Sequence, residues 1–245
     1  MAPSEAFLAS GMPVFNPVII DDLKAEALPV CGTSMLLADG TWEHAPRGEL
    51  IEFIEPEPGH NYVIGADVAM GLANGDWSVA QILDDEKRQV AVWRGKVDAR
   101  RFADILEALG KRYNEAKIAV ENNSFGFATV TRLQHDLYYP NVWTSVQEGV
   151  SDEKNTRNLG FRTNSQSKPM IIARLQEALR TGDIFLNCPI TLEEMRTYIV
   201  TATGAMEADV KCHDDCVMAL ALANYVHEGR VQPLSVDDSW YVEPF

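Results

Sequence analysis

Hydrophobic and polar positions alternate with two different periods along the chain, and these periods predict strands and helices. A short apolar run over 62–69, β-branched at its start, predicts a buried strand with one acid near its end. Two further strands, at 78–83 and 89–93, follow across tight turns and complete an antiparallel meander. Over 98–113 the apolar residues recur at i, i+3, i+4 and i+7, which predicts an amphipathic helix with Asp98 as its N-cap.

The next part of the chain predicts strands that return to the sheet after helical crossovers. A fourth strand at 117–120 ends at Glu121, a helix covers 125–137, and a short fifth strand covers 141–145. The order β-β-β-α-β-α-β predicts an α/β fold in which helices flank a mixed central sheet. In that sheet, three antiparallel strands are followed by parallel strands.

Two more helices are expected toward the C-terminus, one at 168–181 and a last one, rich in Ala and Leu, at 214–228. The polar stretch 146–167 is not expected to be regular throughout. Near the N-terminus we expect a short helix over 18–27 and an extended edge segment within 46–59. These patterns divide the chain into a lead-in at 1–50, one main domain at 51–229 and a tail at 230–245.

Composition supports a folded core and sets one constraint on function. Hydrophobic residues make up 46% of the 245 residues, which is enough for a core. No apolar run approaches the roughly 20 residues that a membrane-spanning helix needs, so we expect no membrane partner. Four cysteines are too few for a disulfide framework and predict free thiols. The net charge of -15 disfavours phosphate binding unless a local basic surface, a metal or a partner supplies positive charge.

Acidic residues stand where the predicted strands and the last helix begin or end. Asp67 lies in the first strand, Glu121 closes the fourth, and Asp214 and Asp215 open the last helix. The two strands are expected to be neighbours, so Asp67 and Glu121 would face each other, with the helix start close by. Clustered carboxylates are costly without a cation, and their hard oxygens suit Mg²⁺ or Mn²⁺.

The acids belong to three motifs that follow one another along the chain. They are Gly65-Ala66-Asp67-Val68-Ala69 with Gly75-Asp76-Trp77-Ser78, then Ala119-Val120-Glu121-Asn122-Asn123, and Lys211-Cys212-His213-Asp214-Asp215 before an Ala/Leu helix. In this order the motifs resemble the nuclease domain of the large terminase subunit of tailed phages. The resemblance covers 50–228 and includes a segment at 160–168 that is similar to the one beside the family's active site.

The resemblance implies an RNase H-like fold and an endonuclease that cuts concatemeric viral DNA during genome packaging, using two Mg²⁺ or Mn²⁺ ions. It implies double-stranded DNA, the portal or procapsid and the small terminase subunit as partners, in the host cytoplasm. It also implies an ATPase domain before the nuclease, and 1–50 would be the linker from it. The chain has no Gly-x-x-x-x-Gly-Lys-Ser/Thr motif, so that domain is expected outside it.

The resemblance assigns roles to the acids. Asp67 would bridge both ions, Glu121 would bind one, and Asp215 or Asp214 the other. Adjacent residues at a helix start point about 100° apart, so one of the pair should be a ligand and the other a cap or a supporting group. Asp215 is preferred as the ligand. Asp76 would support the site from outside the ligand set, although a turn-forming role is the simpler interpretation.

Basic residues in 148–180 are candidates for DNA-phosphate contacts, with a solvated surface as the equal alternative. Lys168 is the first choice. The remaining DNA-binding candidates are Arg162, Asn164, Lys154 and Arg157.

Other interpretations remain open at this point. Cys212, His213 and Cys216 suggest zinc, but without a second ligand pair buried thiols are favoured. A Holliday-junction-resolvase-like phage nuclease shares the logic of the acids. An ATPase of the actin and sugar-kinase class would need a second phosphate loop. A catalytically silent docking module of the packaging motor would use the tail as a partner-binding peptide, although a frayed terminus is slightly preferred.

Overall fold

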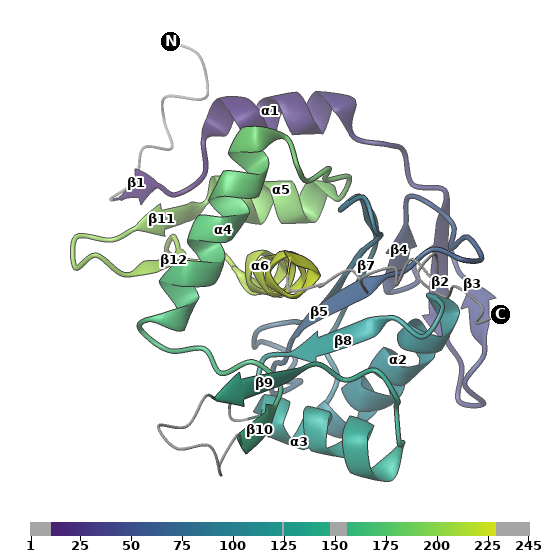
Figure 1. The fold of residues 1–245 in the computed structure, drawn as a ribbon. Helices are drawn as coiled ribbons and strands as arrows, with labels where there is room; N and C mark the ends of the chain where they lie inside the picture. The colour runs from purple at the N-terminus through teal and green to yellow at the C-terminus, as the bar shows by residue number, and fades with distance from the viewer. Residues whose placement is uncertain (1–10, 124, 148–155, 229–245) are drawn as a thin grey trace, which may run out of the picture.

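A seven-stranded mixed sheet runs through the centre of the protein, with helices on both faces (Figure 1). The structure is a computed structural model that describes residues 11–123, 125–147 and 156–228. The strand order is β3-β2-β4-β7-β6-β5-β8, and only β5 and β8 pair in parallel. The strands are β2 (Gly32–Leu36), β3 (Trp42–His44), β4 (Leu50–Glu52), β5 (Val63–Asp67), β6 (Ser78–Leu83), β7 (Gln89–Gly95) and β8 (Lys117–Val120). The meander β5-β6-β7 and the parallel strand β8 confirm the predicted mixed α/β sheet.

Each face of the sheet carries its own set of helices, because side chains alternate along a strand. On β5, Ile64 and Ala66 belong to the core formed with α2 (Ala99–Arg112) and α3 (Phe125–Thr131). Val63 belongs to the core on the opposite face, where α6 (Asp215–Glu228) lies. Outside α6 lie α4 (Ser167–Thr181), α5 (Pro189–Arg196) and α1 (Pro17–Glu26) (Figure 1).

Capping residues mark the ends of three helices, α2, α1 and α4. The Asp98 carboxylate accepts hydrogen bonds from the backbone N–H groups of Arg100 and Arg101, which confirms it as the N-cap of α2. Asn16 caps α1 in the same way, and α4 ends at Gly182, whose φ of 71° is left-handed. The helix expected over 125–137 divides into α3 and a π-helical segment, Arg132–Asp136.

Helix α6 packs against β5 and β6 on one side and against α4 and α5 on the other. Its residues from Val217 to Ala223 are nearly all inaccessible to solvent. Ala is frequent here because the backbone of α6 approaches the sheet closely at Gly65. A Cβ atom at Gly65 would lie 2.2 Å from the Ala219 carbonyl oxygen and 2.4 Å from the Ala223 nitrogen. The helix therefore sits on β5 at a depth that only glycine allows.

Strands from the expected lead-in are hydrogen-bonded into the central sheet. β2 pairs with β4, and β3 pairs with β2, all antiparallel. The extended segment within 46–59 was expected at the edge of the sheet, and this was wrong. Its strand β4 lies inside the sheet, between β2 and β7. The two additional strands are short and half-exposed, so their alternation is weak. The boundary at residue 50 remains a prediction, with the β2–β3 hairpin before it belonging to the same sheet.

The strand expected at 141–145 is only partly correct. Residues 141–143 run beside β8, where the Ile118 N–H donates to the Asn141 carbonyl over 2.9 Å. The chain then leaves as β9 (Thr144–Gln147), which pairs with β10 (Thr156–Leu159) in a separate two-stranded sheet.

Besides β2, β3 and β10, four further elements had no counterpart in the prediction: α5, β1 (Met12–Pro13), β11 (Tyr198–Val200) and β12 (Met206–Ala208). The last three form a small antiparallel sheet in the order β1-β11-β12. Within the described residues, no helix combines the length and apolarity needed to cross a bilayer. The tail at 230–245 lies outside the described residues.

Replacing Gly65 by alanine tests the close approach of α6 to the sheet. We expect Gly65→Ala to lower the free energy of unfolding by about 1–3 kcal/mol or more, because the new methyl group forces the helix outward. Chemical denaturation measures this change. Gly32→Ala is the matched control, since a Cβ there meets only the Glu52 Oε2 atom at 3.6 Å. Equal stability of the two variants would contradict the proposed depth of packing.

Candidate active site

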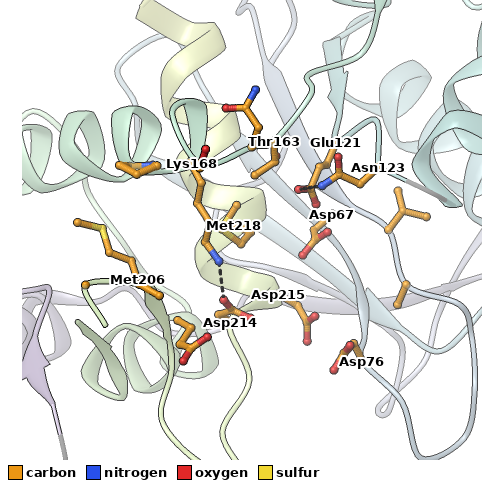
Figure 2. Close-up of a pocket in the computed structure, with 18 of the residues that line it drawn as sticks. Asp67, Asp76, Glu121, Asn123, Thr163, Lys168, Met206, Asp214, Asp215 and Met218 are labelled. Atoms are coloured by element: carbon orange, nitrogen blue, oxygen red, sulfur yellow. Dashed lines mark hydrogen bonds and ion pairs between the residues drawn. The ribbon is translucent and has the colours of Figure 1, made fainter. Parts of the chain in front are cut away.

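Asp67 and Glu121 lie side by side because the sheet places them there. Strand alternation puts Asp67 on the α6 face of β5, like Val63 and Gly65, and Glu121 follows β8 with the same orientation as Ala119. The Glu121 N–H donates to the Ala66 carbonyl over 2.9 Å, so the parallel pairing of β5 and β8 continues up to Glu121. Figure 2 shows the two side chains next to each other, and Glu121 is the acid that most strongly raises the pKa of Asp67. This confirms that the two strands are neighbours and that their acids face each other.

The N-terminus of α6 brings two more acids to the same place (Figure 2). Asp215 is buried in the first turn, and its Oδ2 accepts a hydrogen bond from the Trp77 N–H over 3.3 Å. Asp214 is only partly buried, and its Oδ2 lies 3.4 Å from the Lys168 Nζ. The neighbours therefore differ in environment, and the more enclosed one is Asp215.

The four acids lie at a cleft of about 740 Å³. One wall comes from the start of α4 and the residues before it, and another from the β11–β12 hairpin. The lining residues outside the acids include Asn123, Thr163, Asn164, Lys168, Gly204, Met206 and Glu207. Figure 2 shows the Lys168 side chain reaching across the cleft to Asp214.

Burial and neighbouring carboxylates raise the pKa values of Asp67 and Asp215. Burial raises the pKa of Asp67 well above its usual range, and the neighbouring Glu121 carboxyl raises it further. Burial also raises the pKa of Asp215 to about 7, and the charges of Glu194 and Asp76 add to the rise.

The donor set fits a hard divalent cation. Asp67, Glu121 and Asp215 offer only carboxylate oxygens, which suit Mg²⁺ or Mn²⁺ better than softer metals. Burial and neighbouring carboxylates raise the pKa values of Asp67 and Asp215, and a bound cation would offset both effects. Lys168 supplies one charge, at Asp214 rather than at the Asp67–Glu121 pair.

The other candidate residues differ in their position and in their contacts. Asp76 is exposed at the cleft, with its Oδ1 3.7 Å from the His213 Nδ1. Asn164 uses its side chain to accept the N–H groups of Gln166 and Ser167 at the start of α4. Arg162 is exposed near this turn. Arg157 lies in β10, and Lys154 lies outside the described residues.

Two other basic residues of this stretch have structural partners. Arg174 stacks on Tyr225 with its guanidinium carbon 4.9 Å from the ring centre, and Arg180 pairs with Glu177. The four cysteines are free thiols, and Cys216 is buried as expected, whereas Cys212 is exposed, so the prediction of a buried thiol was wrong for Cys212. In the described part of the chain, one group of His, Cys, Asp and Glu side chains has its ligand atoms within 4.8 Å of one another. It consists of Asp76, His213 and Asp215 and contains no cysteine.

Sequence reasoning missed several residues around the acids. The Asn123 side chain donates to the Glu121 Oε1 over 2.7 Å and holds that carboxylate in place. The His213 Nδ1 lies 3.6 Å from the Asp215 Oδ2. Glu194 of α5 is buried, and its Oε2 accepts the Cys216 N–H over 2.7 Å. Asn123 and His213 belong to the second and third motifs of the sequence and could have been found there, whereas nothing in the sequence pointed to Glu194.

Comparisons with known proteins give one consistent family. A family model described as "Terminase RNaseH-like domain" matches residues 64–225. The large terminase subunit of Thermus phage G20c is 27% identical over 196 residues, which are 75% of this chain and 35% of that protein. The chain thus spans about a third of the length of the curated relatives it matches.

Solved structures agree with this match. The large terminase nuclease of the thermophilic phage G20c with bound magnesium has a TM-score of 0.64 and 25% identity, covering 89% of this chain and 98% of that one. The structure of the same nuclease with bound cobalt matches equally well. The predicted RNase H-like fold and the resemblance to terminases are thereby confirmed.

The raised pKa values predict that removing an acid stabilises the cation-free protein. Such a group favours folding below its unfolded pKa, and this contribution is lost as the pH rises toward its folded pKa. Asp67→Asn should therefore raise the free energy of unfolding at pH 8 in EDTA by about 1–3 kcal/mol, and change it little near pH 4. Denaturant unfolding at both pH values measures the difference.

Adding Mn²⁺ should reverse the order, because a cation that binds only the folded protein stabilises it. Wild type should gain stability with Mn²⁺, whereas Asp67→Asn should gain little. Asp183→Asn, an exposed aspartate outside the cleft, is the control and should behave as wild type. A destabilised Asp67→Asn variant at pH 8 would show that the acids do not repel one another.

Proposed function

The chain belongs to the terminase RNase H-like domain family, and from that membership we propose that it is a metal-dependent DNA endonuclease. Its role would be to cut concatemeric viral DNA during genome packaging, by hydrolysis of the phosphodiester bond. The observation that carries this proposal is the convergence of Asp67, Glu121 and Asp215 in one cleft, on three separate elements.

We assign the acids of the cleft to two Mg²⁺ or Mn²⁺ ions. In Figure 2 Asp67 lies between Glu121 and Asp215, so it would contact both ions, with Glu121 binding one and Asp215 the other. Bound ions of this kind activate a water molecule and stabilise the leaving oxygen of a phosphodiester. The protein's own part is to hold the carboxylates in place before substrate arrives, through Asn123 at Glu121 and Trp77 at Asp215.

Lys168 is our candidate for the phosphate contact. Its ammonium group lies in the cleft, 3.4 Å from Asp214 and 5.7 Å from the centre of the Tyr198 ring. A phosphate entering the cleft meets this positive charge beside the acids. Arg162 would extend the contact along the DNA backbone, while the Asn164 side chain is already engaged at the start of α4.

The partners follow from the family and are part of the proposal. Double-stranded DNA would be the substrate, and the ATPase domain of the terminase, the portal or procapsid and the small subunit would be partners in the host cytoplasm. Because the net charge is -15, the isolated chain should bind DNA weakly and depend on those partners to deliver it.

Cleavage of supercoiled plasmid tests the proposal directly. Wild type should nick and linearise plasmid with Mn²⁺ or Mg²⁺ and not in EDTA. Asp67→Ala should slow cleavage by about 1,000-fold, because the ions supply several kcal/mol and each 1.4 kcal/mol is a factor of ten. Asp183→Ala is the control outside the cleft. A folded wild type that binds Mn²⁺ yet leaves plasmid intact would favour a docking module instead.

Replacing Lys168 tests the phosphate contact separately from the ions. Lys168→Ala should weaken DNA binding and lower the slope of log K against log salt by about one, because one phosphate contact is lost. Binding is measured with Ca²⁺ to prevent cleavage. Lys111→Ala, on the opposite face in α2, is the matched control. Full DNA affinity and cleavage in Lys168→Ala would remove Lys168 from the site.

A further inference from the structure

A buried glutamate and a partly buried arginine form an ion pair near the N-terminus of α6, outside the group of cleft acids. Glu194 of α5 is 7% exposed, and Arg94 of β7 has a side chain 17% exposed. Burying an ion pair costs desolvation that the attraction between the charges often fails to recover. The pair therefore calls for an explanation other than stability.

The geometry of the pair is poor for a purely structural ion pair. The Arg94 Nη2 lies 3.6 Å from the Glu194 Oε1, beyond hydrogen-bonding distance. In the described part of the chain, both the Arg94 Nε and the Glu194 Oε1 are buried without a hydrogen-bond partner. The best contact of Glu194 is instead with α6, since its Oε2 accepts the Cys216 N–H over 2.7 Å.

The contacts of Arg94 and Glu194 form a closed loop that passes through Asp215. The Asp215 Oδ2 accepts the Trp77 N–H over 3.3 Å, and the Arg94 guanidinium carbon lies 4.0 Å from the centre of the Trp77 ring. Arg94 faces Glu194, and Glu194 holds the N–H of Cys216, the residue next to Asp215. Arg94 thus acts on the Asp215 carboxylate through Trp77, and Glu194 acts on the backbone of the same turn through the Cys216 N–H.

A second set of buried hydrogen bonds holds the first turn of α6 from the side of the sheet. The Gln81 Nε2 donates to the Cys216 carbonyl over 3.2 Å and to the Thr191 Oγ1 over 2.9 Å. Thr191 and Glu194 both belong to α5, so α5 binds the Cys216 N–H while Gln81 of β6 binds the Cys216 carbonyl. Side-chain freedom at Asp215 is limited by this arrangement before any cation binds.

We propose that Arg94 and Glu194 are positioning residues that set the orientation of Asp215 for cation binding, through the Trp77 ring and the Cys216 N–H. The inference rests on the proposed function, in which Asp215 is a ligand. Neither residue needs to touch the cation or the DNA. Groups that orient metal ligands in this way typically account for about 10–100-fold in metal affinity.

Mn²⁺ binding, measured by calorimetry on the whole chain, tests the proposal. Glu194→Ala should weaken Mn²⁺ binding about 10–100-fold. Glu194→Gln should stay close to wild type, because its side-chain oxygen still accepts the Cys216 N–H. Glu193→Ala, one residue earlier on α5 and exposed, is the matched control and should bind as wild type.

A double variant separates orientation from stability. Arg94→Met with Glu194→Met removes both charges and should fold at least as well as wild type, since apolar replacement of a buried pair is often neutral or stabilising. Its Mn²⁺ affinity should nevertheless be as low as that of Glu194→Ala. The proposal is overturned if the folded double variant or Glu194→Ala binds Mn²⁺ as Glu193→Ala does. Equal losses in Glu194→Gln and Glu194→Ala would overturn it as well.

Hydrogen exchange at the Cys216 amide distinguishes failure of this proposal from failure of the proposed function. Glu194→Ala should speed this exchange relative to the other helical amides of α6, and Glu194→Gln should not. A wild type that does not bind Mn²⁺ refutes the function, while the exchange rates still decide whether Glu194 fixes the turn. Unchanged exchange in Glu194→Ala would overturn the positioning role in either case.

Discussion

Repulsion among the acids at the floor of the cleft is the interaction on which the site depends. Asp67, Glu121 and Asp215 are held together although burial and neighbouring charge raise the pKa of both aspartates. The stabilisation that holds them comes from the apolar contact between α6 and the sheet, where the helix is almost completely buried. Because the fold gathers the acids in advance, a cation that binds is favoured by the repulsion it relieves.

The position of α6 decides which acid faces the sheet. The helix approaches β5 closely at Gly65, and this contact fixes where its first turn falls. Adjacent residues in that turn point about 100° apart, so Asp214 and Asp215 enter different surroundings. Asp215 turns inward to the Trp77 N–H, and Asp214 turns toward Lys168. These environments favour Asp215 as the ligand and Asp214 as the partner of the basic residue.

The parts of the fold that sequence predicted are those with strong periodicity. The β5-β6-β7 meander, β8, α2, α4 and α6 all bury one regular face, and Asp67 stood out because an acid in an apolar strand is unusual. Short elements such as β11 and β12 carry no measurable period and were missed. Glu194 was missed for a related reason, since its role depends on α5 meeting α6, a tertiary contact that no local pattern records.

The acidic character of the chain bears on how such a site would be used. With a net charge of -15 and several carboxylates in the cleft, a DNA phosphate would be repelled until cations occupied the acids. The same field would concentrate divalent cations, so in the function proposed here cation binding would precede DNA binding. Lys168 alone is too little positive charge to hold a duplex, because the affinity of proteins for DNA is the sum of many phosphate contacts. Cleavage would then depend on another part of the packaging machinery to supply those contacts, and the low affinity of this domain would keep it from cutting DNA that is not delivered to it.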